Sequence, residues 1–173
     1  MDERIEVTLA HFRQAHLDGG PRLFTAETAF LSFLCTLSAT EALAGYRFAA
    51  EGLRTGERFR RFITTYFRPA YHEHAERLWD FRNGMIHAFS PRRMSIIRGA
   101  PGAHLTSDAT DTPVLNAENF FADMEAAAQA YFAELRARPD LQDAFLHRLE
   151  SAEGGGIHVA VVGFAPVEED EDA

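Results

Sequence analysis

The 173-residue sequence contains no lysine, one cysteine, and no apolar run approaching the roughly 18 residues of a membrane span. Because the lone Cys35 cannot form a disulfide within the chain, the composition fits a cytosolic protein. Its position in the apolar run Phe30–Leu37 predicts that Cys35 is a small core residue. The charged start Met1–Arg4 leads directly into a helical pattern, so we expect neither a signal peptide nor a membrane partner.

Charge is distributed unevenly along this acidic chain. The net charge of −9 argues against a general high-affinity nucleic-acid binder, which is normally basic. All 17 basic residues are arginine, and residues 46–98 hold eleven of them against five acidic residues, so the remainder carries −15. A molecule polarised in this way can present a local anion-binding face. The same arginines could equally serve as the solvated surface of helices.

Hydrophobic residues recur at helical spacing through most of the chain, which predicts a mainly α fold, an antiparallel helical bundle. Pro69 is suited to the first turn of a helix, and Asn116 is a plausible N-cap for another. Trp79 is expected to fill core volume. The predicted helices cover residues 2–17, 25–51, 55–67, 69–87 and 139–150, and a fifth helix in chain order follows the Asn116 cap with an apolar stripe from 120 to 135.

One segment breaks the helical pattern. Met94–Arg98 and Ala103–Thr106 bracket a Gly-Ala-Pro-Gly turn, which predicts a small β-hairpin near residues 93–106, inserted in a helical domain spanning residues 1–153. The last segment, 154–173, is expected to hold a glycine joint at 154–156, a strand at 157–164 that could extend the hairpin, and a disordered acidic tail.

The end of the fourth predicted helix carries the residues that say most about chemistry. Arg82 interrupts an apolar stripe, where a charge is costly unless it is paired or faces a cleft. Asn83 and His87 lie one turn apart on the neighbouring polar stripe, which also carries Glu76 and Asp80. An arginine can hold a phosphate through its planar fork of donors, and a histidine can move a proton near neutral pH.

Residues around this motif are candidates for supporting roles. Asp80 and Glu76 could orient Arg82 or the Asn83 amide, and Gly84 allows another backbone or a ligand to approach closely. Further contacts to RNA phosphates are expected from nearby arginines, namely Arg58, Arg61, Arg92 and Arg93. The competing interpretation is structural: Arg82 pairs with Asp80 or Glu76, and His87 caps the helix C-terminus, where a cation is favoured.

No metal site or cofactor is expected. His72 and His74 are two residues apart, so on a helix they point to nearly opposite sides and cannot easily share a metal ion. The sequence also has no glycine loop of the kind that cradles nucleotide phosphates.

Arg82, Asn83 and His87 together resemble the hallmark of the HEPN superfamily (higher eukaryotes and prokaryotes nucleotide-binding): an arginine, a polar residue, three further residues and a histidine. The resemblance covers the bundle, residues 1–90 and the fifth predicted helix. It implies a metal-independent endoribonuclease in which two motifs meet at the cleft of a homodimer. His87 would act as general acid or base, Arg82 would stabilise the charged transition state, and Asn83 would orient His87 or the phosphate.

The resemblance leaves other functions open. HEPN-like proteins also serve as non-catalytic binding or dimerisation modules, and a nucleotide-binding bundle could use the same Arg82 and His87. If the chain cuts RNA, the ribose 2′-OH is the internal nucleophile, so DNA should not be cut. Family analogy suggests a bacterial toxin or defence setting, with RNA as substrate and an antitoxin-like protein as a further partner.

Overall fold

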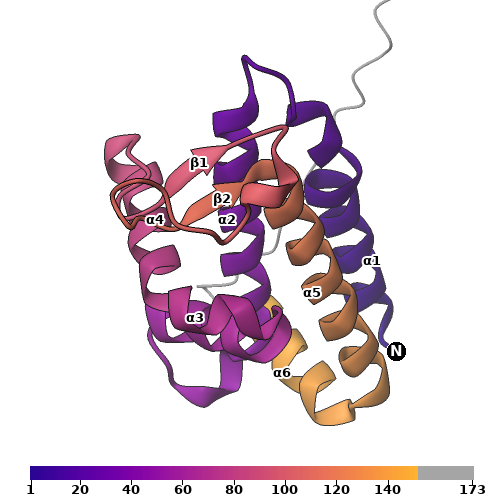
Figure 1. Cartoon of the computed structure of the whole chain (residues 1–173). Helices are drawn as coiled ribbons and strands as arrows, with labels where there is room; N and C mark the ends of the chain where they lie inside the picture. The colour runs from indigo at the N-terminus through magenta and orange to yellow at the C-terminus, as the bar shows by residue number, and fades with distance from the viewer. Residues whose placement is uncertain (152–173) are drawn as a thin grey trace, which may run out of the picture.

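The computed structural model describes residues 1–151, and these residues form six α-helices and two short strands (Figure 1). The predicted mainly α fold is therefore confirmed, and the expected glycine joint, strand and acidic tail of 154–173 lie outside the described residues. The helices are α1 (Glu3–Phe12), α2 (Ala29–Arg47), α3 (Thr55–Tyr66), α4 (Ala75–Ala88), α5 (Ala117–Ala137) and α6 (Pro139–Glu150). The strands are β1 (Ser95–Ile97) and β2 (Val114–Asn116).

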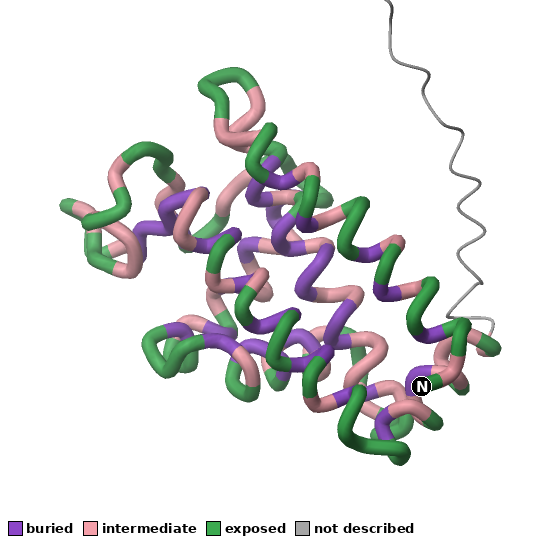
Figure 2. Tube along the Cα trace, turned by 90° about the vertical axis from the view of Figure 1, so that its right-hand side faces the viewer, coloured by how far each residue is buried: buried purple, intermediate pink, exposed green. Residues whose placement is uncertain are grey.

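Helix α2 is the central element of the bundle and packs chiefly against α3 and α5. Figure 1 shows α1, α2 and α5 side by side, with α3 and α4 to one side and the strands near the upper end. The ring of Phe33 on α2 lies 5.9 Å from Phe81 on α4 and 6.4 Å from Phe120 on α5, centroid to centroid. In Figure 2 the buried positions line the inward sides of the helices, which is the arrangement that an amphipathic bundle requires.

Two predicted helices begin later than the sequence indicated. Helix α2 starts at Ala29 rather than at residue 25, because the Thr28 hydroxyl hydrogen bonds with the Thr25 hydroxyl (2.8 Å) and donates to the Leu23 carbonyl (3.0 Å), forming a turn. Helix α4 starts at Ala75, and Pro69–His74 before it is a 3₁₀ helix. The expected start of α5 is confirmed: the Asn116 side chain accepts a hydrogen bond from the Asn119 backbone N–H, 3.0 Å away.

The predicted β-hairpin is wrong. Strand β1 pairs with β2 in parallel, in the register Ser95 to Val114, and not with the segment that follows the turn. That segment instead pairs locally with the start of β2: the Leu105 N–H donates to the Val114 carbonyl and the Val114 N–H donates to the Thr106 carbonyl, both at 2.8 Å. Residues 98–113 thus connect the two parallel strands. Within this connection the chain reverses direction at a 3₁₀ turn, Pro101–Ala103.

Cys35 is exposed, so the prediction that it is a core residue is wrong. The side of α2 that faces the bundle carries Phe33 and Leu37 together with the small hydroxyl residues Ser32, Thr36 and Thr40. Their hydroxyls donate to carbonyls three or four residues earlier, at 2.6, 2.8 and 2.8 Å, which satisfies them without distant partners. This rotation of the helix leaves Leu31 and Cys35 facing outward.

By length and composition alone, α2 is apolar enough to cross a membrane. Half of its most apolar window is buried inside the bundle, however, and its neighbours α3 and α5 cover that side. The core helix of a soluble protein has the same properties, so this helix is weak evidence for a membrane segment.

Candidate functional site

The guanidinium of Arg82 is held by three neighbours. Its Nε forms an ion pair with Oε2 of Glu41 on α2, its Nη1 donates to the Asn83 side-chain oxygen at 3.2 Å, and its carbon Cζ lies 5.4 Å from the centre of a Trp79 ring. The Arg82 side chain is 17% exposed and that of Glu41 is 22% exposed. Among residues 1–151, no hydrogen bond engages the remaining nitrogen, Nη2. One edge of an oriented cation is therefore left for a ligand.

His87 lies on the exposed side of the last turn of α4, five residues beyond Arg82. Within the described part of the chain its ring makes no hydrogen bond or ion pair. Asn83 is half-buried and contacts Arg82 rather than His87. The end of α4 therefore carries an arginine that is held in place and an exposed imidazole without a partner among residues 1–151. Asn83 accepts a hydrogen bond from the arginine and helps to hold it.

The two acidic residues expected to support Arg82 pair with other arginines. Asp80 accepts a hydrogen bond from Nη1 of Arg93 at 2.7 Å, and Glu76 lies 3.3 Å from Nε of Arg60. The carboxylate that orients Arg82 is Glu41 on α2, which the sequence pattern did not identify. Because the two residues are 41 positions apart in the chain, their contact leaves no local signal in the sequence.

The four arginines expected to bind RNA phosphates lie in different surroundings. Arg61 pairs with Glu51 and lies over the ring of Phe48, 5.1 Å away, at the end of α2. Arg58 is half-buried on α3, and its Nε is buried without a hydrogen bond. Arg93 is tied to Asp80, whereas Arg92 is exposed beside the end of α4. Of the four, Arg92 lies beside Gly84 in the motif segment, and Arg93 contacts the same helix at Asp80.

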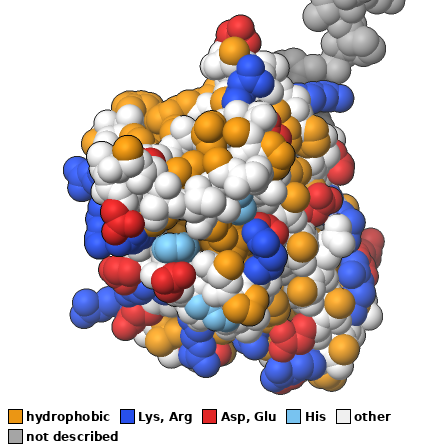
Figure 3. Space-filling model, viewed as in Figure 1, with side chains coloured by type: hydrophobic (Ala, Val, Ile, Leu, Met, Phe, Trp, Pro, Cys, Tyr) orange, Lys and Arg blue, Asp and Glu red, His pale blue; other side chains and the backbone are white. Residues whose placement is uncertain are grey.

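The basic segment does not form one free cationic face. Six of the eleven arginines in residues 46–98 form ion pairs within the described residues: Arg47, Arg60, Arg61, Arg68, Arg82 and Arg93. Figure 3 shows the same intermixing, since acidic and basic side chains alternate on the face it draws. The local anion-binding face suggested by the charge distribution is therefore limited to a few positions near α3 and α4.

Gly84 permits the turn that follows α4 to fold back against the helix. A Cβ atom on Gly84 would lie 2.4 Å from the Ser90 carbonyl oxygen and 2.9 Å from Cγ of Arg92. The expected close approach of another backbone at this glycine is confirmed. The N–H groups of Phe89 and Ser90 both bond to the Gly84 carbonyl, and Phe89 adopts a left-handed conformation (φ 48°) that closes the helix.

A second polar cluster lies in the interior, away from the motif. The His104 ring is 4% exposed, and its Nδ1 accepts from the Asn116 backbone N–H at 3.1 Å. In the neutral ring Nε2 therefore carries the proton and donates to the Tyr71 hydroxyl at 2.7 Å, while that hydroxyl donates to Asp123 at 2.8 Å. Arg68 completes the cluster with an ion pair to Asp123 at 2.7 Å. These hydrogen bonds and this ion pair link the 3₁₀ helix before α4 to α5.

Comparisons with known protein families, with curated proteins and with solved structures found no match. The resemblance to the HEPN superfamily therefore depends on Arg82, Asn83 and His87 and on the helical setting. Within residues 1–151, no group of three or more histidine, cysteine or acidic side chains is arranged to hold a metal ion.

Proposed function

We propose that the protein is an HEPN-like, metal-independent endoribonuclease of the cytosol that acts as a homodimer. The observation that carries the proposal is the state of Arg82: three neighbours fix its guanidinium, and Nη2 remains without a partner among the described residues. A preoriented cation stabilises charge that develops on a phosphate without having to reorganise during the reaction. A free histidine on the same helix end supplies the proton transfer that cleavage by the 2′-OH requires.

The roles of the motif residues follow from this geometry. His87 removes the proton of the ribose 2′-OH or delivers one to the leaving 5′ oxygen, and Arg82 holds the non-bridging phosphate oxygens through Nη2. Asn83 fixes the guanidinium rather than the imidazole. The attacking oxygen bonds to phosphorus as the P–O bond to the 5′ oxygen breaks, which leaves a 2′,3′-cyclic phosphate.

An exposed apolar surface beside the motif supports a dimer. Ile86 and Phe89 follow Arg82 by four and seven residues, so the three lie on one stripe at the end of α4. The two apolar side chains are 38% and 77% exposed, respectively. Phe89 is also held at positive φ, an unfavourable conformation for an exposed aromatic residue. A second copy packed on this stripe would cover both apolar side chains and bring two motifs together.

RNA cleavage in the presence of a chelator tests the proposal. Purified protein should cut single-stranded RNA and leave a 2′,3′-cyclic phosphate or its hydrolysed form, and a 2′-deoxy residue at the cut site should abolish cleavage. His87→Ala should lower the rate about 10²-fold or more. His147→Ala is the matched control, because His147 is also exposed in the last turn of a helix. Activity that survives His87→Ala, or that requires magnesium, would contradict the mechanism.

A non-catalytic HEPN-like module is the second candidate. The ion pair with Glu41 favours it, since that contact alone gives the buried charge of Arg82 a structural purpose. Such a module would bind a partner without cutting RNA, and both His87→Ala and the wild-type protein would then be equally inactive on every RNA tested.

A further inference from the structure

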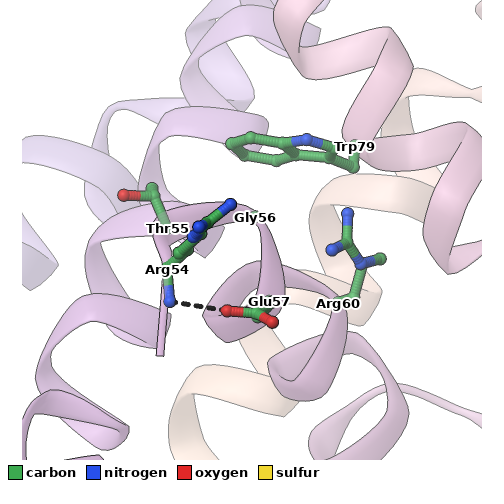
Figure 4. A pocket seen from close by; sticks show the side chains of 6 residues that line it. All are labelled: Arg54, Thr55, Gly56, Glu57, Arg60 and Trp79. Carbon is green, nitrogen blue, oxygen red and sulfur yellow. Dashed lines mark hydrogen bonds between the residues drawn. The ribbon is translucent and has the colours of Figure 1, made fainter. Parts of the chain in front are cut away.

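A hollow of about 410 Å³ lies where the start of α3 meets α4. It is lined by Arg54, Thr55, Gly56, Glu57, Arg60 and Trp79. In Figure 4 the indole of Trp79 lies across the top of this space, Glu57 lies below it, and the guanidinium of Arg60 lies to one side and points toward the indole. The volume is within the range of small-ligand sites, and none of the motif residues lines it.

Trp79 packs against the edge of the core and also lines this hollow, so the sequence expectation that it fills core volume is only partly met. The indole is half-buried and rests against the first turn of α3, where a Cβ on Gly56 would lie 2.8 Å from its Cε2 atom. Its inner side packs against Phe59, with ring centroids 5.5 Å apart. These contacts support one side of the ring while part of it lines the hollow, and aromatic side chains placed in this way can contact nucleic-acid bases.

The polar lining supplies arginines that can bind a phosphate and a carboxylate that can accept a hydrogen bond from a base or a ribose. Arg60 is 32% exposed and paired at 3.3 Å with Glu76, whose side chain is 62% exposed. Such a solvent-exposed pair contributes little stability, so a phosphate can replace Glu76 as the partner of Arg60. Arg54 adds a second exposed cation. Glu57 Oε2 accepts from the Arg54 backbone N–H at 2.8 Å, and its other oxygen is available to a base or ribose donor.

The hollow is coupled to the proposed catalytic arginine through Trp79. The tryptophan lines the hollow and also lies 5.4 Å from Cζ of Arg82, one helical turn further along α4. A nucleotide held against the indole is therefore adjacent to the guanidinium that would hold the scissile phosphate.

We propose that this hollow is a nucleotide subsite, in which Trp79 contacts the base and Arg60 and Arg54 hold the phosphate. The inference rests on the proposed function in one respect only, the assignment of the nucleotide to an RNA substrate. A free nucleotide presents the same chemistry, a base that carries a phosphate.

Trp79 is the only tryptophan of the chain, so its fluorescence reports on the hollow directly. The full-length protein is titrated with AMP, GMP, CMP and UMP, with a short single-stranded RNA, and with inorganic phosphate, under excitation at the red edge of indole absorption. A saturable change with nucleotide or RNA is expected. Arg60→Gln should weaken this binding about tenfold or more, because a charged hydrogen bond is lost.

Arg136→Gln is the matched control, since it removes one exposed arginine from α5, away from the hollow, and should leave the titration unchanged. His87→Ala should also leave the titration unchanged while lowering the cleavage rate about 10²-fold or more, so a binding failure and a catalytic failure are distinguishable. In cleavage assays, Arg60→Gln should raise KM more than it lowers kcat.

Each outcome of the titration has a meaning. Saturation by mononucleotides assigns the hollow to free nucleotides as well as RNA, and saturation by RNA alone assigns it to residues within a strand. An equal response to inorganic phosphate would show an anion site without base contact and overturn the proposal. The absence of saturation with all nucleotides and RNA, or an equal effect of Arg60→Gln and Arg136→Gln, would also overturn it.

Discussion

Arg82 forms an ion pair with Glu41, and its Nη2 has no hydrogen-bond partner among residues 1–151, so its removal should affect stability as well as activity. Arg82→Ala leaves the buried Oε2 of Glu41 without its cation, so we expect a loss of about 1–3 kcal/mol in the free energy of unfolding. The exposed His87 has no such partner within the described residues, and His87→Ala should leave stability unchanged. Urea denaturation of both variants measures the difference.

The double variant Arg82→Met with Glu41→Gln serves as the control, because it removes both charges of the pair and should recover part of the loss. If His87→Ala proved as destabilising as Arg82→Ala, the assignment of His87 as a free catalytic group would be wrong.

Two buried tyrosines should respond in opposite ways to loss of the hydroxyl. The Tyr71 hydroxyl joins His104 to Asp123, so Tyr71→Phe should cost about 1–3 kcal/mol by leaving two buried polar groups poorly satisfied. Tyr131 is fully buried, and its hydroxyl has no hydrogen-bond partner among residues 1–151. Tyr131→Phe should therefore be neutral or stabilising by up to about 1 kcal/mol. Thermal melts of the two variants test this contrast, and equal losses would refute it.

At the scale of elements, the end of α4 depends on a glycine that allows the chain to turn back. A Cβ on Gly84 would meet the backbone oxygen of Ser90 at 2.4 Å, and that backbone cannot move aside as a flexible side chain could. Gly84→Ala should shift the following turn, cost about 1–3 kcal/mol and lower activity although it changes no motif residue. Denaturation and cleavage assays on the same preparation measure both effects.

Gly45, inside α2, is the matched control for that substitution. The nearest atom to a Cβ placed on Gly45 would be the flexible end of Arg148, 3.7 Å away, so Gly45→Ala should fit and gain up to about 1 kcal/mol from helix propensity. If both variants behaved alike, the close approach at Gly84 would not be what shapes the helix end.

At the scale of the whole molecule, Asp123 makes stability depend on pH. Burial raises the pKa of Asp123, but the neighbouring His104 ring, 3.5 Å away, and hydrogen bonds from Tyr71 and Arg68 outweigh it and hold the pKa below its ordinary value of 3.8. Since the folded pKa is the lower one, this stabilisation is complete above that ordinary value and is lost as pH falls through the folded pKa. Stability should therefore decline in acid below about pH 4.

Urea denaturation of the wild type and Asp123→Asn over an acidic pH series tests this dependence, and the variant should show a shallower decline. Asp143→Asn is the control, because Asp143 is exposed on α6 and forms no ion pair within the described residues. Identical pH profiles for wild type and Asp123→Asn would contradict the prediction.

The proposed dimer is also a property of the whole molecule. Phe89→Asp places a charge at the most exposed apolar position of the stripe and should convert a dimer into a monomer at concentrations on the order of tens of micromolar in sedimentation experiments. Val7→Asp changes an apolar exposed residue on α1, 47% exposed, and should leave the dimer intact. A wild-type protein that sediments as a monomer at this concentration would count against the dimer and the shared cleft.

The sequence alone determined most of the helices and the candidate motif. Apolar periodicity, Pro139 and the Asn116 cap are local signals, because a helix is built from contacts within four residues. The arginine, amide and histidine of the motif were visible for the same reason, since they occupy one stretch of six residues.

Only the tertiary structure decided which residues these elements meet. Strand β1 pairs in parallel with β2, which follows it only after a long connection. Cys35 is exposed because hydroxyl residues occupy the side of α2 that faces the core. Arg82 pairs with Glu41 rather than with Asp80. Each choice depends on contacts between segments distant in the chain. Burial and pairing energies between elements outweigh the small local preferences in such cases, and no periodicity in the sequence records them.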